Sequence, residues 1–106
     1  FYDGPVNDGK FKNFEWKCDV LTKPKANSGM YFHTKWQKEG FPKTGIEVQV
    51  NNSHTDPIRT GSMYRLHDIM NDAPAEDDKW FTQTVIVNGN KITVKVNDNT
   101  TTFVAQ

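Results

Sequence analysis

The sequence predicts an all-β domain, an antiparallel β-sandwich or jelly roll. Composition is the first indication, because 9 Val, 5 Ile and 11 Thr stand against only 2 Leu and 4 Ala. β-Branched side chains suit a pleated surface, whereas Leu and Ala are the usual helix residues. The second indication is a period-two alternation of apolar and polar residues in several short runs. The third is the spacing of Gly, Pro, Asn and Asp turn signals between those runs, which is typical of sandwiches.

Size and charge limit the function classes. The chain has 106 residues, enough for one domain over residues 1–106, and its 13 basic residues balance 13 acidic ones. A neutral chain lacks the basic footprint of a nucleic-acid binder. No apolar run approaches the roughly 20 residues of a membrane span. Cys18 is the only cysteine, so no internal disulfide forms, and its place between Trp16 and Val20 indicates a small buried hydrophobe.

The first half of the chain predicts three strands. Residues 1–13 are rich in Gly, Asp and Asn and indicate an entry loop. Strands are then expected over residues 14–20, 29–34 and 46–50, each with alternating apolar and polar positions. The connections between them contain proline or glycine, which fits turns and a long loop.

The second half predicts four more strands. A short strand is expected at 61–66, followed by an acidic loop over 67–79. Strands at 80–87 and 91–96 flank the hairpin signal Asn88-Gly89, and a last one covers 100–104. Trp80 is expected to begin its strand and pack in the core.

Several short motifs occur in an order that resembles a known family. They are Asn13-Phe14-Glu15, Ala26-Asn27-Ser28-Gly29-Met30-Tyr31-Phe32, Gly45-Ile46-Glu47-Val48-Gln49-Val50, Thr60-Gly61-Ser62-Met63-Tyr64, Trp80, and Val87-Asn88-Gly89-Asn90-Lys91-Ile92. Over about residues 11 to 104 the chain resembles the 3-keto-disaccharide hydrolase domain family. The resemblance implies a concanavalin A-like lectin/glucanase jelly roll. It also implies an exported protein, periplasmic or extracellular, that cleaves glycosides carrying a ketone at C3.

The chain departs from this family in three ways. One affects only a turn, because the family's later Asn-Gly is Asn97-Asp98 here. The family often has Arg where this chain has His33, which affects a substrate or charge contact. Jelly rolls of this type are also longer than this chain. The domain is therefore expected to be incomplete, with another segment or chain completing its sheets, because open sheet edges are normally paired or covered.

Strand parity selects one candidate site. Side chains at i and i+2 project to the same side of a strand, so Glu47 and Gln49 point together, and Tyr31 and His33 do the same. Tyr64 follows in its own strand. If these strands share a sheet, the five side chains line one concave polar face suited to sugar hydroxyls and proton transfer. The alternative is an ordinary solvated sheet face.

The chemistry that the resemblance implies assigns candidate roles to these groups. A C3 ketone acidifies the C2 proton, and Glu47 or His33 is the candidate base that removes it. His54 is the candidate acid or a metal ligand, and His54 with Asp56 is a candidate site for a divalent cation. The alternative for these two residues is an Asn/Asp/Pro turn. Arg59 is a candidate substrate contact, and Trp36 is a candidate stacking platform for a sugar ring.

Three function classes stay open at this point. The first is a glycoside-cleaving enzyme of the keto-sugar type, with a carbohydrate as partner. The second is a non-catalytic carbohydrate-binding module of the same fold, because a fold does not fix a function. The third is a structural assembly domain that uses the exposed face as an interface. A titratable group with a shifted pKa at Glu47 or His33 favours the enzyme. A flat platform of Trp36, Phe41 and Tyr64 without a buried acid favours the binding module.

Overall fold

The computed structural model describes residue 2 and residues 4–105 and is built almost entirely from antiparallel strands. A short 3-10 turn, η1 (Val6–Gly9), precedes them. The strands are β1 (Phe14–Val20), β2 (Ser28–Phe32), β3 (Ile46–Val50), β4 (Phe81–Asn88), β5 (Lys91–Val96) and β6 (Asn99–Ala105). The all-β antiparallel class predicted from the sequence is confirmed.

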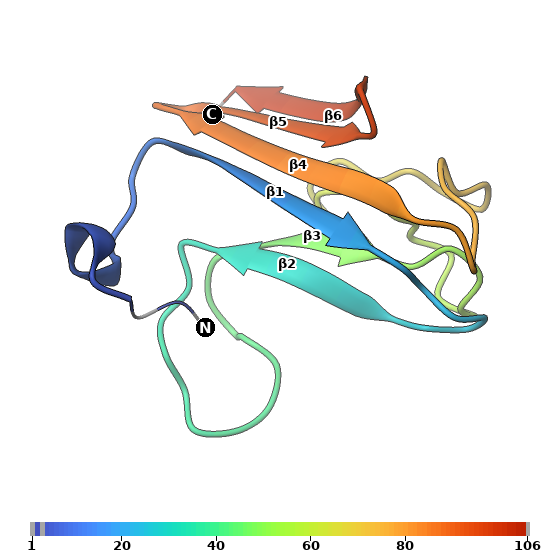
Figure 1. Ribbon diagram of the computed structural model, residues 1–106, viewed down its shortest axis with the longest axis horizontal. Coiled ribbons are helices and arrows are strands. Elements are labelled where there is room, and N and C mark those ends of the chain that lie inside the picture. The colour runs from blue at the N-terminus through green and yellow to red at the C-terminus, as the bar shows by residue number, and fades with distance from the viewer. Residues whose placement is uncertain (1, 3, 106) are drawn as a thin grey trace.

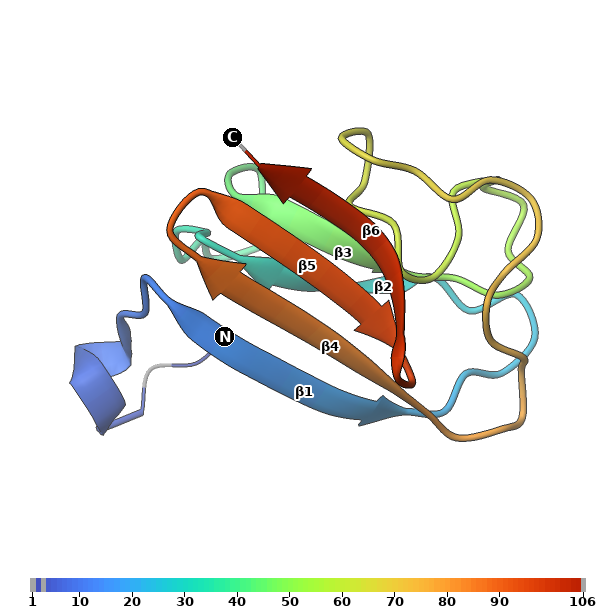
Figure 2. The ribbon, with the colours of Figure 1, turned by 90° about the horizontal axis from the view of Figure 1, so that it is seen from above.

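The strands form two sheets that lie face to face (Figures 1 and 2). One sheet has the order β1-β4-β5-β6, and the other pairs β2 with β3. The core between them consists of alternate side chains from both sheets, which is the packing of a β-sandwich. Its buried residues are Met30, Phe32, Val48, Met63, Val85, Val87, Ile92 and Val94. Cys18 packs against this cluster as predicted, but it is only partly buried.

The clearest sequence patterns give the most regular elements. β1 and β3 match the predicted bounds, and β5 does the same. In β4, the residues Phe81, Val85 and Val87 point inward and are buried. The hairpin joining β4 to β5 is confirmed. It pairs Asn88 with Lys91, so its loop is residues 89–90, and Gly89 has a φ of 60°, a backbone conformation that favours glycine.

The region predicted as a strand at 61–66 is not a regular strand. It contributes one isolated bridge, between Met63 and Val48, and then turns back through residues 64–67. Gly61 and Arg65 have φ values of 86° and 61°, in the left-handed region that interrupts an extended chain. The segment still lies along β3 and forms a third row of the smaller sheet.

Trp80 does not pack in the core, and that prediction is wrong. Its side chain is 69 % exposed, and β4 begins one residue later. Since Phe81 and Val85 point inward, the period-two rule places Trp80 on the outer side of the sheet.

Three strands lie at sheet edges among the described residues, and one of them, β6, is partly covered, because the His67 ring contacts the Phe103 N–H and carbonyl. β1 and β6 end the larger sheet, and β2 ends the smaller one. An edge strand presents unpaired backbone N–H and C=O groups, which another strand can pair. That a further segment or chain completes the sheets stays a prediction.

Candidate active site

Two neighbouring strands bring the predicted polar side chains together on the outer face of the smaller sheet. Tyr31 of β2 lies directly opposite Glu47 of β3, and Gly29 lies opposite Gln49. On the other side of β3, the Tyr64 backbone N–H donates to the Glu47 carbonyl oxygen at 2.9 Å. Directly paired residues of adjacent strands project to the same side of a sheet. Tyr31, Glu47 and Tyr64 therefore form one row across three chain segments, and we call this the Glu47 face.

Glu47 has the environment of a proton-transfer group. Its carboxylate is half-buried and hydrogen-bonds to the Tyr31 hydroxyl. Burial raises the pKa of Glu47 above its ordinary value, the Tyr31 hydrogen bond lowers it, and the charge of Asp56 raises it. Burial and the neighbouring Glu47 charge also raise the pKa of Tyr31 to about 12, so its phenol stays protonated at neutral pH. Gly29 provides space for Glu47, because a Cβ there would overlap its Oε2.

A second carboxylate, Asp56, lies beside this row and is held in its ionised form. Its Oδ1 accepts the Ile58 backbone N–H at 3.0 Å, and its Oδ2 accepts the Tyr64 hydroxyl at 2.9 Å. These hydrogen bonds, the Ile58 one first, lower the pKa of Asp56. Two carboxyl groups whose environments move their pKa values in opposite directions are the usual basis of an acid–base site. Sequence reasoning did not connect Asp56 with Tyr64, because a loop brings the two together.

His54 lies in the same loop and is fixed by backbone contacts. Its N–H donates to Asn51 Oδ1 at 2.8 Å, and its ring Nδ1 accepts the Asp56 N–H at 2.9 Å. A neutral His54 therefore carries its proton on Nε2. Both Asp56 oxygens and His54 Nδ1 already accept hydrogen bonds, which fits the turn interpretation of this loop better than a cation site. Across residue 2 and residues 4–105, no group of three or more His, Cys, Asp or Glu side chains is arranged to hold a metal.

Two buried amides support the loop from beneath. Gln49 is only 1 % exposed, and its Nε2 donates to the Ile58 carbonyl at 3.1 Å. Asn51 is fully buried, and its Nδ2 donates to the carbonyls of Asp56 and Ile58. Gln49 was expected to contact substrate, but the loop covers it, so it positions the site. The sequence pattern did not predict such a role for Asn51. The feature that could have indicated it is a polar residue directly after the strand that ends at Val50.

His33 does not join the Glu47 face, and its expected placement beside Tyr31 is wrong. β2 ends at Phe32, and His33 has a φ of 55°, so the side-chain alternation stops there. Its ring centroid lies 5.1 Å from that of Phe32 and 6.0 Å from that of Phe14, both of which contact the core.

Arg59 connects loops, and nothing in its surroundings points to a substrate. Its Nη1 donates to Asn51 Oδ1 at 3.0 Å and to the His54 carbonyl at 2.8 Å, while its Nε donates to the Asn71 carbonyl at 2.7 Å. The guanidinium fork thus ties the 51–60 loop to residue 71. This structural role accounts for its Nε and Nη1 atoms, and the substrate contact of Arg59 stays a prediction.

Replacing Arg59 by Lys tests that role. Lysine keeps the charge but not the fork, so Arg59→Lys is expected to lower the free energy of unfolding by about 1–2 kcal/mol. Arg65→Lys is the matched control, because Arg65 is exposed and lies over the Tyr64 ring at 5.5 Å, where lysine retains the cation. Chemical denaturation measures both. Equal stabilities of the two variants contradict the assignment.

Trp36 lies in the loop between β2 and β3, and its side chain is 66 % exposed. Phe41 in the same loop is 75 % exposed. Both rings are open to a ligand, and the stacking role of Trp36 stays a prediction.

The two carboxyl groups predict opposite pH effects on stability. Because the pKa of Glu47 is raised, this residue contributes to the free energy of unfolding most at low pH. The contribution is complete below the ordinary pKa of 4.5 and is lost as pH rises through the folded-state pKa. Glu47→Gln should therefore gain stability relative to the wild type as pH rises. The lowered pKa of Asp56 gives a contribution that is present above the ordinary value of 3.8 and is lost as pH falls through the folded-state pKa. Asp56→Asn should lose most at neutral pH. Thermal unfolding across this pH range checks both, and slopes of the same sign would contradict the assignment.

The fold and the face together define a class of protein: an antiparallel β-sandwich with a carboxylate–phenol site on one outer sheet face. The sequence pattern of the 3-keto-alpha-glucoside-1,2-lyase-like domain family matches residues 5–105, and the chain belongs to this family. No curated protein matches the chain. None of the helices among the described residues has the length and apolar character needed to cross a membrane.

Proposed function

We propose that this protein cleaves glycosides whose C3 hydroxyl has been oxidised to a ketone, with Glu47 as the base. Membership of the family supports the substrate class. The observation that carries the assignment of the base is the half-buried Glu47 carboxylate, beside the Tyr31 phenol and the ionised Asp56.

The first step is removal of the C2 proton by Glu47. Because C2 is next to the C3 ketone, the electron pair left on C2 delocalises into an enolate oxygen. The phenols of Tyr31 and Tyr64 lie on either side of Glu47. Each would donate to that oxygen by turning its hydroxyl away from its present carboxylate partner, which is Glu47 for Tyr31 and Asp56 for Tyr64. Raising the pKa of Glu47 by burial strengthens it as a base near neutral pH.

The second step breaks the bond between C1 and the departing oxygen. The enolate electrons form the C1–C2 double bond, and the leaving oxygen takes a proton. His54 is the candidate donor, because its Nδ1 is occupied by the Asp56 N–H and its Nε2 carries the proton. Water then adds: its hydroxyl goes to C1 and its proton restores His54, while C2 takes a proton from Glu47 after that carboxyl has exchanged with solvent. The sum is hydrolysis. His33 and Arg59 take no part in these proton transfers, given their contacts with Phe32 and with loop carbonyls.

The test compares a glucose disaccharide with its C3-oxidised form. We expect release of the leaving sugar from the oxidised form alone, because only a ketone makes the C2 proton acidic enough to remove. Equal release from both forms would contradict the mechanism.

A second candidate function rests on a different observation. Trp36 and Phe41 are largely exposed in one loop, which is typical of an aromatic surface for sugar rings. A carbohydrate-binding module would bind both disaccharides and release nothing. The half-buried Glu47 favours the enzyme, since a binding platform needs no carboxyl with a raised pKa.

A further inference from the structure

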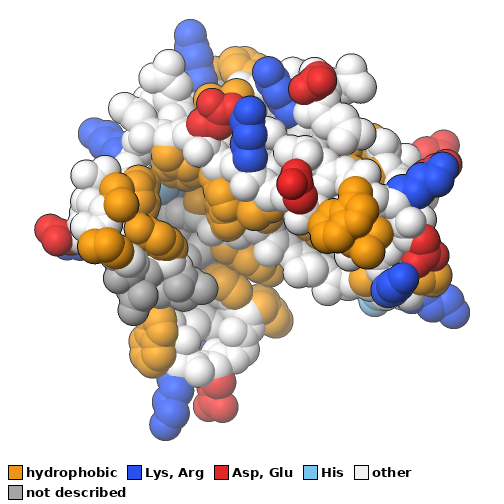
Figure 3. Space-filling model, in the orientation of Figure 1, with side chains coloured by type: hydrophobic (Ala, Val, Ile, Leu, Met, Phe, Trp, Pro, Cys, Tyr) orange, Lys and Arg blue, Asp and Glu red, His pale blue; other side chains and the backbone are white. Residues whose placement is uncertain are grey.

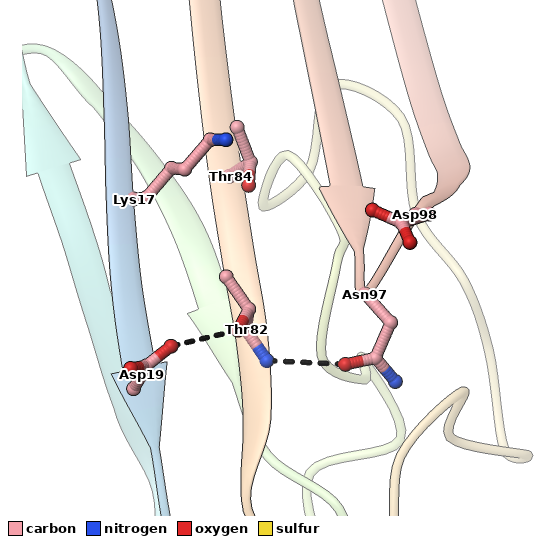
Figure 4. Close-up of a pocket in the computed structure, with 6 residues that line it drawn as sticks. All are labelled: Lys17, Asp19, Thr82, Thr84, Asn97 and Asp98. Carbon is pink, nitrogen blue, oxygen red and sulfur yellow. Dashed lines mark hydrogen bonds between the residues drawn. The ribbon is translucent and has the colours of Figure 1, made fainter.

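The face of the molecule opposite Glu47 carries a polar groove. It lies on the outer surface of the larger sheet, which Figure 2 presents in front of the smaller one. Asp19 of β1 and Thr82 of β4 are paired in register and project outward, because their neighbours Val20 and Phe81 point to the core. The groove has a volume of about 500 Å³, and its lining residues are Lys17, Asp19, Thr82, Thr84, Asn97 and Asp98 (Figure 4). We call it the β1–β4 groove.

Three side chains of the groove, Asp19, Thr82 and Asn97, are held by hydrogen bonds and keep further hydrogen-bonding capacity. The Thr82 hydroxyl donates to Asp19 Oδ1 at 2.7 Å, and the Thr82 backbone N–H donates to Asn97 Oδ1 at 3.2 Å. The Asn97 backbone N–H also donates to the Thr82 carbonyl at 2.7 Å. In Figure 4 the amide nitrogen of Asn97 points away from Thr82. Among the described residues, the Asn97 Nδ2 and the second oxygen of Asp19 hold no hydrogen bond, so a donor and an acceptor stay available.

An exposed aromatic ring extends the groove at one end. Trp80, together with Phe81, lines the continuation of the groove that also includes Asp19, Thr82 and Asn97. The Trp80 ring is 69 % exposed, although its apolar area is large enough that burial would normally be favoured. An aromatic face beside a small set of fixed donors and acceptors is the usual form of a sugar-binding surface, since sugar rings offer C–H groups on one face and hydroxyls at the edge.

Charge selects the kind of ligand. One cation, Lys17, stands among two carboxylates, Asp19 and Asp98, so the groove lacks the basic cluster that a phosphate or sulfate chain would need. Figure 3 shows acidic and basic side chains interspersed over the side of the molecule in view, with no single-sign region. Neutral hydroxyl groups, which both donate and accept, match this mixed lining.

We propose that the β1–β4 groove is a second saccharide-binding surface, separate from the Glu47 face, with Trp80 as the stacking platform and Asp19 and Asn97 as the hydroxyl contacts. Its ligand is a neutral oligosaccharide. The two surfaces lie on opposite sides of the sandwich, so a chain bound in the groove leaves the Glu47 face open.

The test is a nuclear magnetic resonance titration with maltopentaose and cellopentaose as neutral probes. It uses the Glu47→Gln variant, so that no turnover occurs. We expect shifts at the Trp80 indole N–H, the Asn97 side-chain amide and Thr82, with affinity falling at least about 10-fold in Trp80→Ala. Trp36→Ala is the matched control, because Trp36 is 66 % exposed but lies in the β2–β3 loop.

Two results would overturn the proposal. One is that neither maltopentaose nor cellopentaose shifts the resonances of the groove residues. The other is loss of the groove shifts in Trp36→Ala while Trp80→Ala retains them. Neither depends on release of a sugar from a keto substrate, so failure here is distinct from failure of the proposed function.

Discussion

Glu47→Gln is expected to reduce release of the leaving sugar from a 3-keto disaccharide by about 10³-fold, within the range measured for removing a general base. Glutamine has nearly the same shape and can still accept a hydrogen bond from Tyr31, but it cannot take a proton from C2. The loss should fall mainly on kcat, because the carboxylate acts on the C2 proton more than it contributes to binding the sugar.

Glu15→Gln is the control for this variant. This substitution makes the same change of charge and size as Glu47→Gln. Glu15, however, is exposed on the outer side of β1, in the other sheet. Its activity should match the wild type. Equal losses of activity in the two variants would mean that the change in net charge causes the effect. Full activity of Glu47→Gln would remove Glu47 from the mechanism.

Gly29→Ala is expected to reduce activity by about 10²-fold although every polar side chain of the site is retained. The new Cβ would overlap the Glu47 carboxylate, so the carboxylate must move, and a misplaced catalytic group costs roughly that factor. Because the atoms in the way belong to a side chain and not to the backbone, the sheet should keep its fold.

The neighbouring Ser28→Ala is the matched control. Ser28 is exposed and projects to the opposite side of β2, so its change to alanine, which removes a hydroxyl and adds no carbon, leaves the Glu47 carboxylate in place. Circular dichroism should show both variants folded. Full activity of Gly29→Ala would contradict the close approach of Glu47 to β2.

Period-two patterns predicted the parts of the fold in which one face is buried and the other polar. Glu47 and Tyr31 lie on the same outer face because each alternates with core residues along its strand. This alternation can be read from the sequence without knowing the path of any loop. The same rule, applied to Phe81 and Val85, places Trp80 outward, so the expectation that this tryptophan packs in the core did not follow the parity of its strand. His33 obeys the alternation in sequence, but its own backbone is left-handed, so its side chain leaves the Glu47 face.

The remainder of the site depends on a loop that has no period. Asp56 reaches Tyr64 because the buried amides of Gln49 and Asn51 bind the carbonyls of the 51–60 loop and fold it over the sheet. Those contacts are side-chain hydrogen bonds within a turn-rich segment. A segment of the same composition can follow many different backbone paths, so the sequence does not predict this one. The structural role of Arg59 was hidden for the same reason.

The fate of the hydrogen at C2 tests the central claim most directly. In D₂O, cleavage of a 3-keto disaccharide through proton removal and re-addition of water places deuterium at C2 of the product, above the rate of exchange without protein. We expect this incorporation with the wild type and its loss, together with release, in Glu47→Gln. A released product that keeps its original hydrogen at C2 would show that cleavage occurs without Glu47 acting as a base there.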